Sequence, residues 1–495
     1  MPTEGPLRDA ADPLVLGIDL GTTNVKALLV DGKGAVISQG SAPVSVRYTE
    51  DGGAEQDIEE IWQATRTAMR DAARDLPEAA GRSSERVRAI GVSSQGGAIQ
   101  ILDSSDRAVG PIIGWQDARG KPWDRALTSR MGQEWLVQRT GASHSAGAIG
   151  QILRLRDSGV FTSRSRLAFA GDIVVGRLCG RRAHDATSLS EPCLLNPSTG
   201  DADDALLEVL GLDRSRLPPL LAADSVAGTL LPEVAGSLGL AAGIPVGPAV
   251  HDQYAAALGS GTVRAGDTML GSGTAWVLVA VADHIAPPIG GAALVGRHPV
   301  AGLYGQMLSM ENGGSCISWA TRTLGLGSPG VHEVDRILRS VPDGCAGLRF
   351  RPLLQQIASL PPGMTGRIDG LRLEHTAAHV VRAVVEGLAC ELGRFLAMMR
   401  DAGVRVERLV LCGKAASSAV TPQIISDTIG LPVDCVSAAE TSALGAAVLG
   451  RALLERGRGL QDLAYALRPS LTRVQPGPGS QGARGRLDAY LEDFR

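Results

Sequence analysis

Residues 14–30 read LVLGIDLGTTNVKALLV, with two β-type runs on either side of a short turn of glycine and threonine. The first run is apolar as far as Asp19, and the second covers residues 25–30. The backbone N–H groups and threonine hydroxyls of such a turn can hold a phosphate group. A third run at 35–38 extends the hairpin to a three-stranded meander.

A second turn of the same kind occurs in the other half of the chain. Residues 270–274 read LGSGT and stand between β-type runs at 267–269 and 276–281. Because both halves open on this pattern, the sequence suggests duplication of one lobe. Two phosphate-holding hairpins that face one nucleotide indicate a phosphoryl-transfer enzyme built from two lobes.

The remaining chain alternates strand-like and helical segments, which predicts the α/β class. We place the lobe boundary between Gly259 and Gly266, so that an N-terminal lobe covers 1–262, a C-terminal lobe 263–475 and a tail 476–495. Helices are predicted at 57–75, 315–324, 373–399, 422–429 and 442–454, with a loose stretch at 476–482 before a short terminal helix at 487–494. Strands are predicted at 87–93, 408–412 and 432–436, and residues 99–102 are expected to pair with the first of these.

Composition excludes several functional classes. The chain has 495 residues, 44% of them hydrophobic, and a net charge of −4, which predicts a globular protein with no pull toward nucleic acid or anionic membrane. Seven scattered cysteines without a C-x-x-C pair argue against a disulfide framework and a zinc site. Residues 1–12 lack the apolar core of a signal peptide, and we expect a cytoplasmic protein.

Asp19 stands at the end of the first strand, beside Gly21, Thr22 and Thr23. A carboxylate at this point can hold Mg²⁺ through water while the turn holds phosphate. The alternative is an aspartate that caps a hairpin turn. The presence of the second turn favours the functional interpretation.

Asp252 lies in the stretch PAVHDQ at 248–253, between a strand-like run and a helix of small residues. An aspartate at the start of a helix can accept the proton of an attacking hydroxyl, but it can equally be a helix N-cap. His251 could be a general base instead, although the sequence shows no carboxylate to orient it. The other histidines show no metal-ligand spacing.

The stretch WQDAR at 115–119 combines a flat ring, amides and a bidentate donor. Trp115, Asp117 and Arg119 suit the apolar faces and hydroxyls of a sugar. Taken alone, the stretch is more typical of a surface loop with an ion pair.

Eight short motifs follow one another in an order that resembles the FGGY carbohydrate kinases, the family of xylulokinase, gluconate kinase and glycerol kinase. The likeness runs from about residue 14 to 455. The motifs are LGIDLGTT at 16–23 with Lys26, SSQGG at 93–97, WQDAR at 115–119, GPAVHDQ at 247–253, LGSGT at 270–274, NGGS at 312–315 with Trp319, RAVVEG at 382–387 and LGAA at 444–447.

The resemblance implies two actin-like, ribonuclease-H-like lobes with ATP and Mg²⁺ in the cleft between them. Asp252 matches the family's catalytic base, and Asp19 matches the aspartate associated with Mg²⁺. The matches at the nucleotide are Gly21, Thr22, Thr23 and Lys26 in the first turn, Gly271, Gly273 and Thr274 in the second, and Gly313 and Gly314. The matches at the sugar are Gln95, Gly96, Gly97, Trp115, Asp117, Arg119, His251 and Gln253.

The sequence departs from the family pattern in three places. In the adenosine motif, where Gly413, Lys414, Ala415 and Ser418 are the expected nucleotide contacts, Lys414 occupies a position that is normally glycine. Its side chain could clash with adenine or add a cation near phosphate. Residues 352–358 stand where many members have Gly-Glu-Arg. Gly96 and Gly97 replace bulkier sugar-loop side chains, which predicts a roomier pocket for a larger polyol or a cyclitol and argues against plain xylulokinase activity.

The sequence thus predicts ATP-dependent phosphorylation of a hydroxyl group on a small sugar, polyol or cyclitol. One alternative is a catalytically weak member that binds sugar or nucleotide as a sensor. Another is an actin- or chaperone-like ATPase, against which the sugar-side motifs argue. The expected partner is a small-molecule substrate, without nucleic acid or membrane, and a homodimer is left possible.

Overall fold

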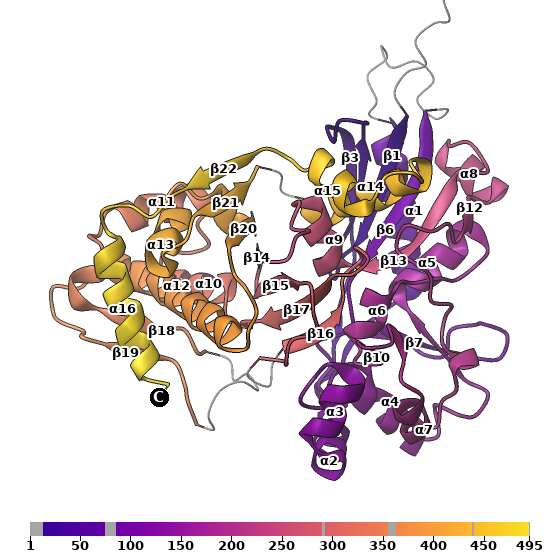
Figure 1. Ribbon diagram of the computed structural model, residues 1–495, viewed down its shortest axis with the longest axis horizontal. Coiled ribbons are helices and arrows are strands. Elements are labelled where there is room, and N and C mark those ends of the chain that lie inside the picture. The colour runs from indigo at the N-terminus through magenta and orange to yellow at the C-terminus, as the bar shows by residue number, and fades with distance from the viewer. Residues whose placement is uncertain (1–12, 75–85, 290–292, 355–362, 438–439, 495) are drawn as a thin grey trace, which may run out of the picture.

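The computed structural model describes residues 13–74, 86–289, 293–354, 363–437 and 440–494. Two large sheets form the centres of two lobes, the first on the right of Figure 1 and the second on the left. The strands of the first sheet are, in spatial order, β12 (Gly228–Thr229), β13 (Pro245–His251), β6 (Val87–Ser94), β1 (Leu14–Leu20), β2 (Asn24–Val30) and β3 (Val36–Pro43). The predicted meander is β1, β2 and β3, and β1 runs parallel to β6 on its other side.

The second sheet repeats this arrangement with one strand added at an edge. Its strands are β16 (Ala293–Arg297), β17 (Tyr304–Ser309), β15 (Trp276–Ala282), β14 (Asp267–Ser272), β20 (Arg408–Gly413), β21 (Val433–Val436) and β22 (Leu471–Val474). The central β14 is antiparallel to β15 and parallel to β20, as β1 is to β2 and β6. The predicted two-lobed α/β architecture is therefore confirmed, whereas the boundary at 262 and 263 stays a prediction.

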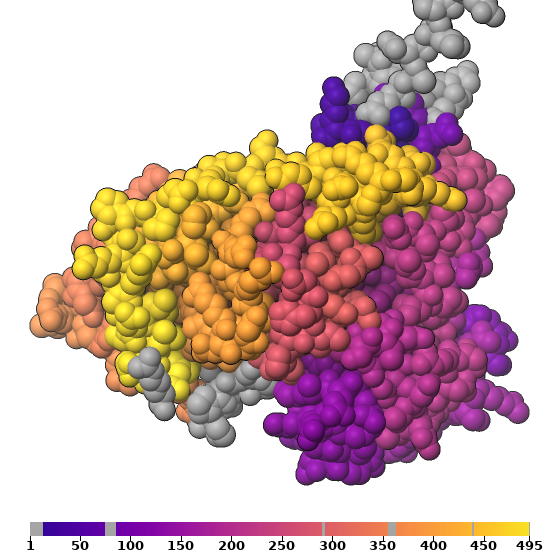
Figure 2. Space-filling view, in the orientation of Figure 1, coloured from indigo at the N-terminus to yellow at the C-terminus, as the bar shows by residue number. Residues whose placement is uncertain are grey.

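Two short central helices join the lobes by packing on each other. α9 (Asp252–Gly259) continues from β13, and α14 (Thr441–Leu454) lies on β1 and β6 of the first sheet. The approach is so close that a β-carbon at Gly445 would overlap the backbone of Ala255. Figures 1 and 2 show the yellow C-terminal segment lying across both lobes. Small residues at this crossing therefore set how the lobes meet.

Helices cover the sheets and complete two apolar cores. The first sheet packs with α1 (Ile58–Arg74), α5 (Ala170–Cys179) and α8 (Pro232–Leu238). The second packs with α10 (Gly314–Thr323), α11 (Val331–Arg339), α12 (Ala377–Asp401), α13 (Thr421–Ile429) and α16 (Ser480–Glu492). α15 (Leu460–Leu467) packs beside α9 and α14. Among the described residues, no helix has the length and apolar character needed to cross a membrane.

A smaller sheet stands on the first lobe. It contains β4 (Arg47–Tyr48), β5 (Ala54–Gln56), β8 (Ile112–Ile113), β7 (Ile99–Leu102) and β9 (Arg166–Phe169). Around it lie α2 (Lys121–Met131), α3 (Gln133–Thr140), α4 (Ala148–Asp157), α6 (Ala186–Ser190), α7 (Asp204–Leu210) and the hairpin of β10 (Leu195–Asn196) and β11 (Asp201–Ala202). In the second lobe, β18 (Arg349–Arg351) and β19 (Arg367–Asp369) form a separate hairpin.

Two expectations about elements were wrong. Residues 99–102 do not pair with β6: β7 pairs with β8 and β9 in the smaller sheet. Both edges of β6 are already occupied by β1 and β13, and the positive φ of Gly97 turns the chain away. The terminal helix α16 begins at Ser480, inside the stretch expected to be loose. Leu487 packs against Gly393 of α12, which anchors this helix.

Candidate active site

A cleft of about 1,120 Å³ lies between the lobes, and both glycine–threonine turns line it. The predicted site residues in its wall are Thr22, Thr23, Lys26, Trp115, Asp117, Asp252, Gln253, Gly271, Gly273, Thr274, Gly413 and Lys414. These residues come from five segments of both lobes. The chain thus brings its predicted phosphate, base and sugar positions to one opening.

The first turn is bonded to the sugar side of the cleft. Oγ1 of Thr22 donates to Oε1 of Gln95 at 3.0 Å and accepts from Nε1 of Trp115 at 3.1 Å. Gln56 connects the same groups, because its amide donates to the Thr22 carbonyl and its Oε1 accepts from Gln95. Thr22 therefore positions Trp115 and Gln95, whereas Thr23 is exposed in the cleft wall.

Asp19 is a partly buried carboxyl group behind the first turn, with Oγ of Ser93 donating to it at 3.0 Å. Burial, together with the negative charge of Asp252, raises the pKa of Asp19 to about 7. A cation would relieve this cost, so the residue suits a divalent ion. The described residues contain no cluster of three or more histidine, cysteine, aspartate or glutamate side chains that could hold a metal.

Lys26 of β2 lines the cleft and reaches to the start of α14, which packs against the same strand. Its Nζ lies 2.5 Å from Oε2 of Glu440, and both side chains are about one-third exposed. This ion pair joins the first sheet to the segment that enters α14. It also holds a cation at the edge of the cleft.

The second turn is held in place by hydrogen bonds of Ser272 and by the loop before α10. Oγ of Ser272 accepts from the N–H of Ala415 at 2.9 Å and donates to the Cys412 carbonyl. Gly313 and Gly314 pack against this turn, and the N–H of Gly314 donates to the Gly273 carbonyl at 3.2 Å. These two glycines support the turn from behind, and Glu311 of the loop and Ser315 of α10 lie in the cleft wall.

The residues of the expected adenosine motif lie in two different places, the cleft wall and the buried start of α13. Gly413 has a φ of 82°, and the exposed Lys414 starts the 3-10 helix Lys414–Ser417. Lys414 lines the cleft without backbone strain, because the left-handed position is that of Gly413. Ser418 is buried instead, where its hydroxyl donates to Asp335 and caps the start of α13. Of residues 352–358, those from 355 onward lie outside the described residues.

Asp252 is the first residue of α9, at the point where β13 ends. The N-cap position belongs to His251, which makes no side-chain cap bond, so Asp252 is not the cap weighed as an alternative. Burial raises the pKa of Asp252 to about 6, although hydrogen bonds from Gln253 oppose the shift. Nε2 of His251 lies 3.2 Å from Oδ1 of Asp252, and burial lowers the pKa of His251 to about 3. His251 is therefore a neutral donor beside a carboxylate that is readily protonated.

The sugar loop is not as open as its two glycines suggest. A β-carbon at Gly96 would overlap the ring of His251, and one at Gly97 would overlap the carboxyl group of Glu191. The expected roomier pocket is therefore wrong at these positions, because side chains from other segments fill the space. Sequence reasoning missed Glu191, since nothing in its local sequence marks it.

Asp117 and Arg119 form an ion pair inside the smaller sheet. The guanidinium group contacts Asp117 at 2.6 Å and Glu55 at 2.8 Å, and the Asp117 carboxylate also accepts from the N–H of Ala54. Arg119 does not line the cleft, whereas Trp115 is 47% exposed in its wall. The ion pair holds the loop that presents Trp115.

Comparison with known sequences places the chain in a family. Residues 14–259 match the N-terminal domain of the FGGY family of carbohydrate kinases, and residues 298–453 match its C-terminal domain. The chain belongs to the FGGY family of carbohydrate kinases.

Named relatives of this FGGY kinase cover most of its length. The chain is 27% identical to a xylulose kinase of Escherichia coli (strain K12) over 456 residues, with 91% of this chain and 92% of the relative covered. It is 30% identical to a glycerol kinase of Thermus brockianus over 482 residues, with 93% of each covered. The crystal structure of xylulose kinase from Rhodospirillum rubrum superposes with a TM-score of 0.86 at 24% identity, over 97% of this chain and 98% of that one. The predicted kinase fold and enzyme class are confirmed.

Several cleft residues of this FGGY kinase were not identified from its sequence. Tyr48, Lys121 and His144 line the cleft wall, and Tyr48 donates to Gln116 at 2.7 Å. They come from a two-residue strand, a helix start and a loop, where no periodic pattern marks a site. Glu440 was missed for the same reason.

Proposed function

We propose that this FGGY kinase transfers the γ-phosphoryl group of ATP to a hydroxyl group of a small sugar, polyol or cyclitol, with Asp252 as the general base. The observation that carries the proposal is the position of Asp252. It lies at the start of α9, in the wall of a cleft lined by both glycine–threonine turns. The cleft therefore offers a phosphate grip from each lobe, with the Asp252 carboxylate in the same wall.

The chemistry follows from the environment of Asp252. A carboxylate with a pKa near 6 is a stronger base than an exposed aspartate and is still ionised at pH 7. It would accept the proton of the acceptor hydroxyl as that oxygen attacks phosphorus. His251 is neutral, and its Nε2 lies 3.2 Å from Oδ1 of Asp252, so it adds no positive charge beside the carboxylate.

Charge on the phosphates must be balanced for transfer to occur. Thr23 and the second turn would supply hydrogen-bond donors, and Lys26 and Lys414 supply positive charge at the cleft. Mg²⁺ would be held by Asp19 together with water and phosphate oxygens, and it neutralises phosphate charge when bound. Closure of the lobes would exclude water, which competes with the acceptor hydroxyl.

Replacement of the base tests this proposal. The wild type is expected to phosphorylate at least one acceptor in a panel of xylulose, glycerol, gluconate and inositols, and Asp252→Asn to lower kcat by about 10²- to 10⁴-fold. The exposed Asp224→Asn is a control with the same chemical change. Full turnover by Asp252→Asn would show that the base is another group. Binding of ATP and Mg²⁺ without turnover on any acceptor would favour the sensor alternative, and GTP in place of ATP tests the nucleotide preference.

The remaining proposals concern the setting of the enzyme. We propose that it acts in the cytoplasm on a small-molecule substrate and forms a homodimer. The acidic net charge of −4 supports the absence of a nucleic-acid or membrane partner. Light scattering after size-exclusion chromatography measures the mass, and a monomer at micromolar concentration would contradict the dimer.

A further inference from the structure

We propose that Glu191 is a specificity residue for the acceptor: its carboxyl group accepts a hydrogen bond from a second substrate hydroxyl, next to the hydroxyl that Asp252 deprotonates. This inference rests on the proposed function. It names a contact on the sugar side that neither the family motifs nor the sequence pattern indicates.

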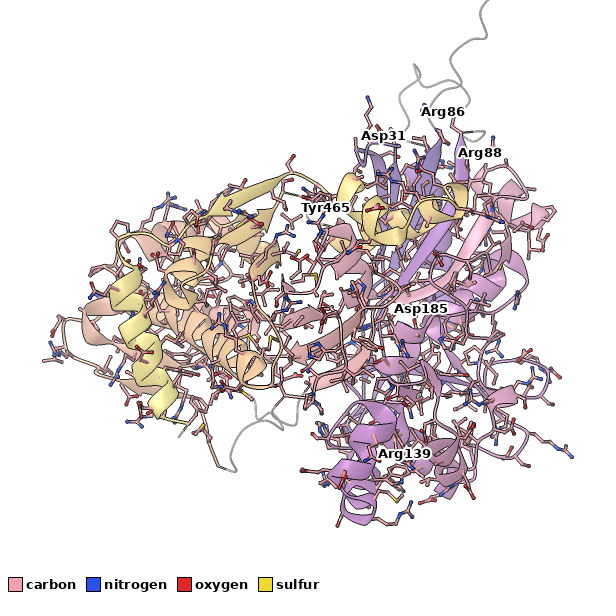
Figure 3. All side chains as sticks on the ribbon, in the orientation of Figure 1. Asp31, Arg86, Arg88, Arg139, Asp185 and Tyr465 are labelled. Carbon is pink, nitrogen blue, oxygen red and sulfur yellow. The ribbon has the colours of Figure 1, made fainter. Side chains whose placement is uncertain are left out.

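The segment before Glu191 is held rigidly against the first sheet. Asp185, labelled in Figure 3, caps α6, and its Oδ1 accepts from the N–H groups of Thr187 and Ser188 at 3.1 and 3.2 Å. The hydroxyl of Thr187 in turn accepts from the N–H of His251 at 3.0 Å. Glu191 follows the last residue of α6, so the same framework positions both Glu191 and the segment that carries Asp252.

The side chain of Glu191 lies directly under the sugar loop. A β-carbon at Gly97 would lie 2.9 Å from its Cδ, and one at Gly96 would lie 2.8 Å from its Cγ and would overlap Nε2 of His251. That same Nε2 is 3.2 Å from Oδ1 of Asp252. Glu191, His251 and Asp252 therefore lie next to one another, and Gly96 and Gly97 pack directly against the first two side chains.

One oxygen of the Glu191 carboxyl group lacks a donor among the residues that the structure describes. Its Oε2 is buried without a hydrogen-bond partner among the described residues, while the side chain as a whole is only partly buried. A buried polar atom without a partner costs about 1–3 kcal/mol, and such atoms in native proteins call for a functional explanation. Burial and the charge of Asp252 raise the pKa of Glu191 to about 7, as expected where no donor stabilises the carboxylate. A substrate hydroxyl would supply that donor.

A neutral hydroxyl fits this position better than a protonated amine. A positive charge beside Glu191 would stabilise the ionised form of Asp252 and lower its pKa. The base would then be weaker at the moment when it must accept a proton. A hydroxyl donor satisfies Glu191 and leaves Asp252 unchanged.

The test uses Glu191→Gln, which keeps the shape of the side chain and removes the carboxylate. With the best acceptor from the panel, we expect the KM for the acceptor to rise about 10- to 100-fold, which corresponds to one hydrogen bond to a charged group. The KM for ATP should change less than about 2-fold, because Glu191 is not in the phosphate turns. Glu208→Gln, an exposed residue of α7, is the matched control.

Deoxy analogues of the same acceptor identify the contact. With one deoxy analogue, the KM of the wild type should rise by a similar factor. With that same analogue, the KM of Glu191→Gln should not rise further. If the deoxy analogue and the Glu191→Gln substitution raise the KM independently of each other, the role of Glu191 is overturned. The same holds if Glu191→Gln keeps the wild-type melting temperature and leaves the KM for the acceptor unchanged. A preference of the wild type for an amino sugar over its hydroxyl counterpart would also overturn it.

The outcomes separate this inference from the proposed function. If the wild type phosphorylates no acceptor, both fail. If Asp252→Asn keeps full activity while Glu191→Gln raises the KM for the acceptor, the base assignment fails and the specificity role stands. Should Glu191→Gln fold poorly, Gly97→Ala, which pushes a methyl group toward the Glu191 carboxyl, is expected to raise the same KM selectively, and an unchanged KM would overturn the proposal.

Discussion

At the scale of single residues, the site concentrates carboxyl groups whose pKa values are raised. Burial raises the pKa values of Asp19 and Glu191 to about 7 and that of Asp252 to about 6. The ionised form of each carboxyl group destabilises the fold, and a bound cation or a hydrogen-bond donor of the substrate would stabilise it. The site is thus arranged for ligands at some expense to the stability of the free protein.

Asp19→Asn tests, in the absence of metal, how much the Asp19 carboxylate destabilises the fold. The folded pKa of about 7 exceeds the ordinary 3.8, so the wild type loses stability as pH rises from about 4 to 7 and regains none above it. The variant lacks this penalty, and its melting temperature at pH 8 should exceed that of the wild type by at least about 2 °C. The difference should vanish near pH 4. A scanning calorimetry series with EDTA measures it, and an equal difference at both pH values would refute the assignment.

At the scale of elements, α14 is the helix that joins the two lobes. Its backbone meets β1, β6 and α9 without intervening side chains, because Gly17, Gly91 and Gly445 lie at the contacts. Helices that approach so closely leave no room for an added methyl group. The glycine content of this region is therefore required by packing between elements.

Gly445→Ala should separate α14 from α9. The new methyl group would overlap the Ala255 carbonyl, and overpacking of this kind costs about 1–3 kcal/mol. We expect a lower melting temperature and, because α9 carries Asp252, a lower kcat. Gly485→Ala in the exposed helix α16 is the matched control: nothing lies within 4 Å of its β-carbon position, and alanine favours a helix. Equal melting temperatures for the two variants would contradict the packing argument.

At the scale of the whole molecule, the cleft is shared between lobes and carries charges from both. Lys26 comes from the first sheet, and Glu440 precedes the helix that crosses from the second lobe. Glu440 holds the cation that a nucleotide phosphate would also attract. Under the proposed function, Glu440 would therefore compete with the nucleotide phosphates for Lys26.

Glu440→Gln should release Lys26 for the nucleotide. Removal of the competing carboxylate is expected to tighten the binding of ATP with Mg²⁺ by about 2- to 5-fold, as for a partly exposed ion pair. Titration calorimetry without acceptor measures the Kd. Glu455→Gln, at the other end of α14, makes the same change in net charge and should leave the Kd unchanged. Weaker binding by Glu440→Gln would mean that the ion pair stabilises the binding conformation.

Local sequence patterns were enough for the elements and the family. Alternating apolar runs and glycine–threonine turns identified β1, β2, β14 and β15 because such patterns reflect the conformation of a few neighbouring residues. The order of the motifs indicated the FGGY family, which the matches over 14–259 and 298–453 confirm. The residues proposed at the cleft stay predictions as to their roles.

Packing between distant segments decided the rest. The placement of β7 in the smaller sheet, the bond from Thr22 to Gln95 and the closure of the space at Gly96 and Gly97 by His251 and Glu191 all join residues far apart in the chain. No local pattern encodes such contacts, because they depend on which surfaces meet once the sheets are formed. The two glycine–threonine turns could therefore be read from the chain alone, whereas the packing of His251 and Glu191 against Gly96 and Gly97 emerged only after folding.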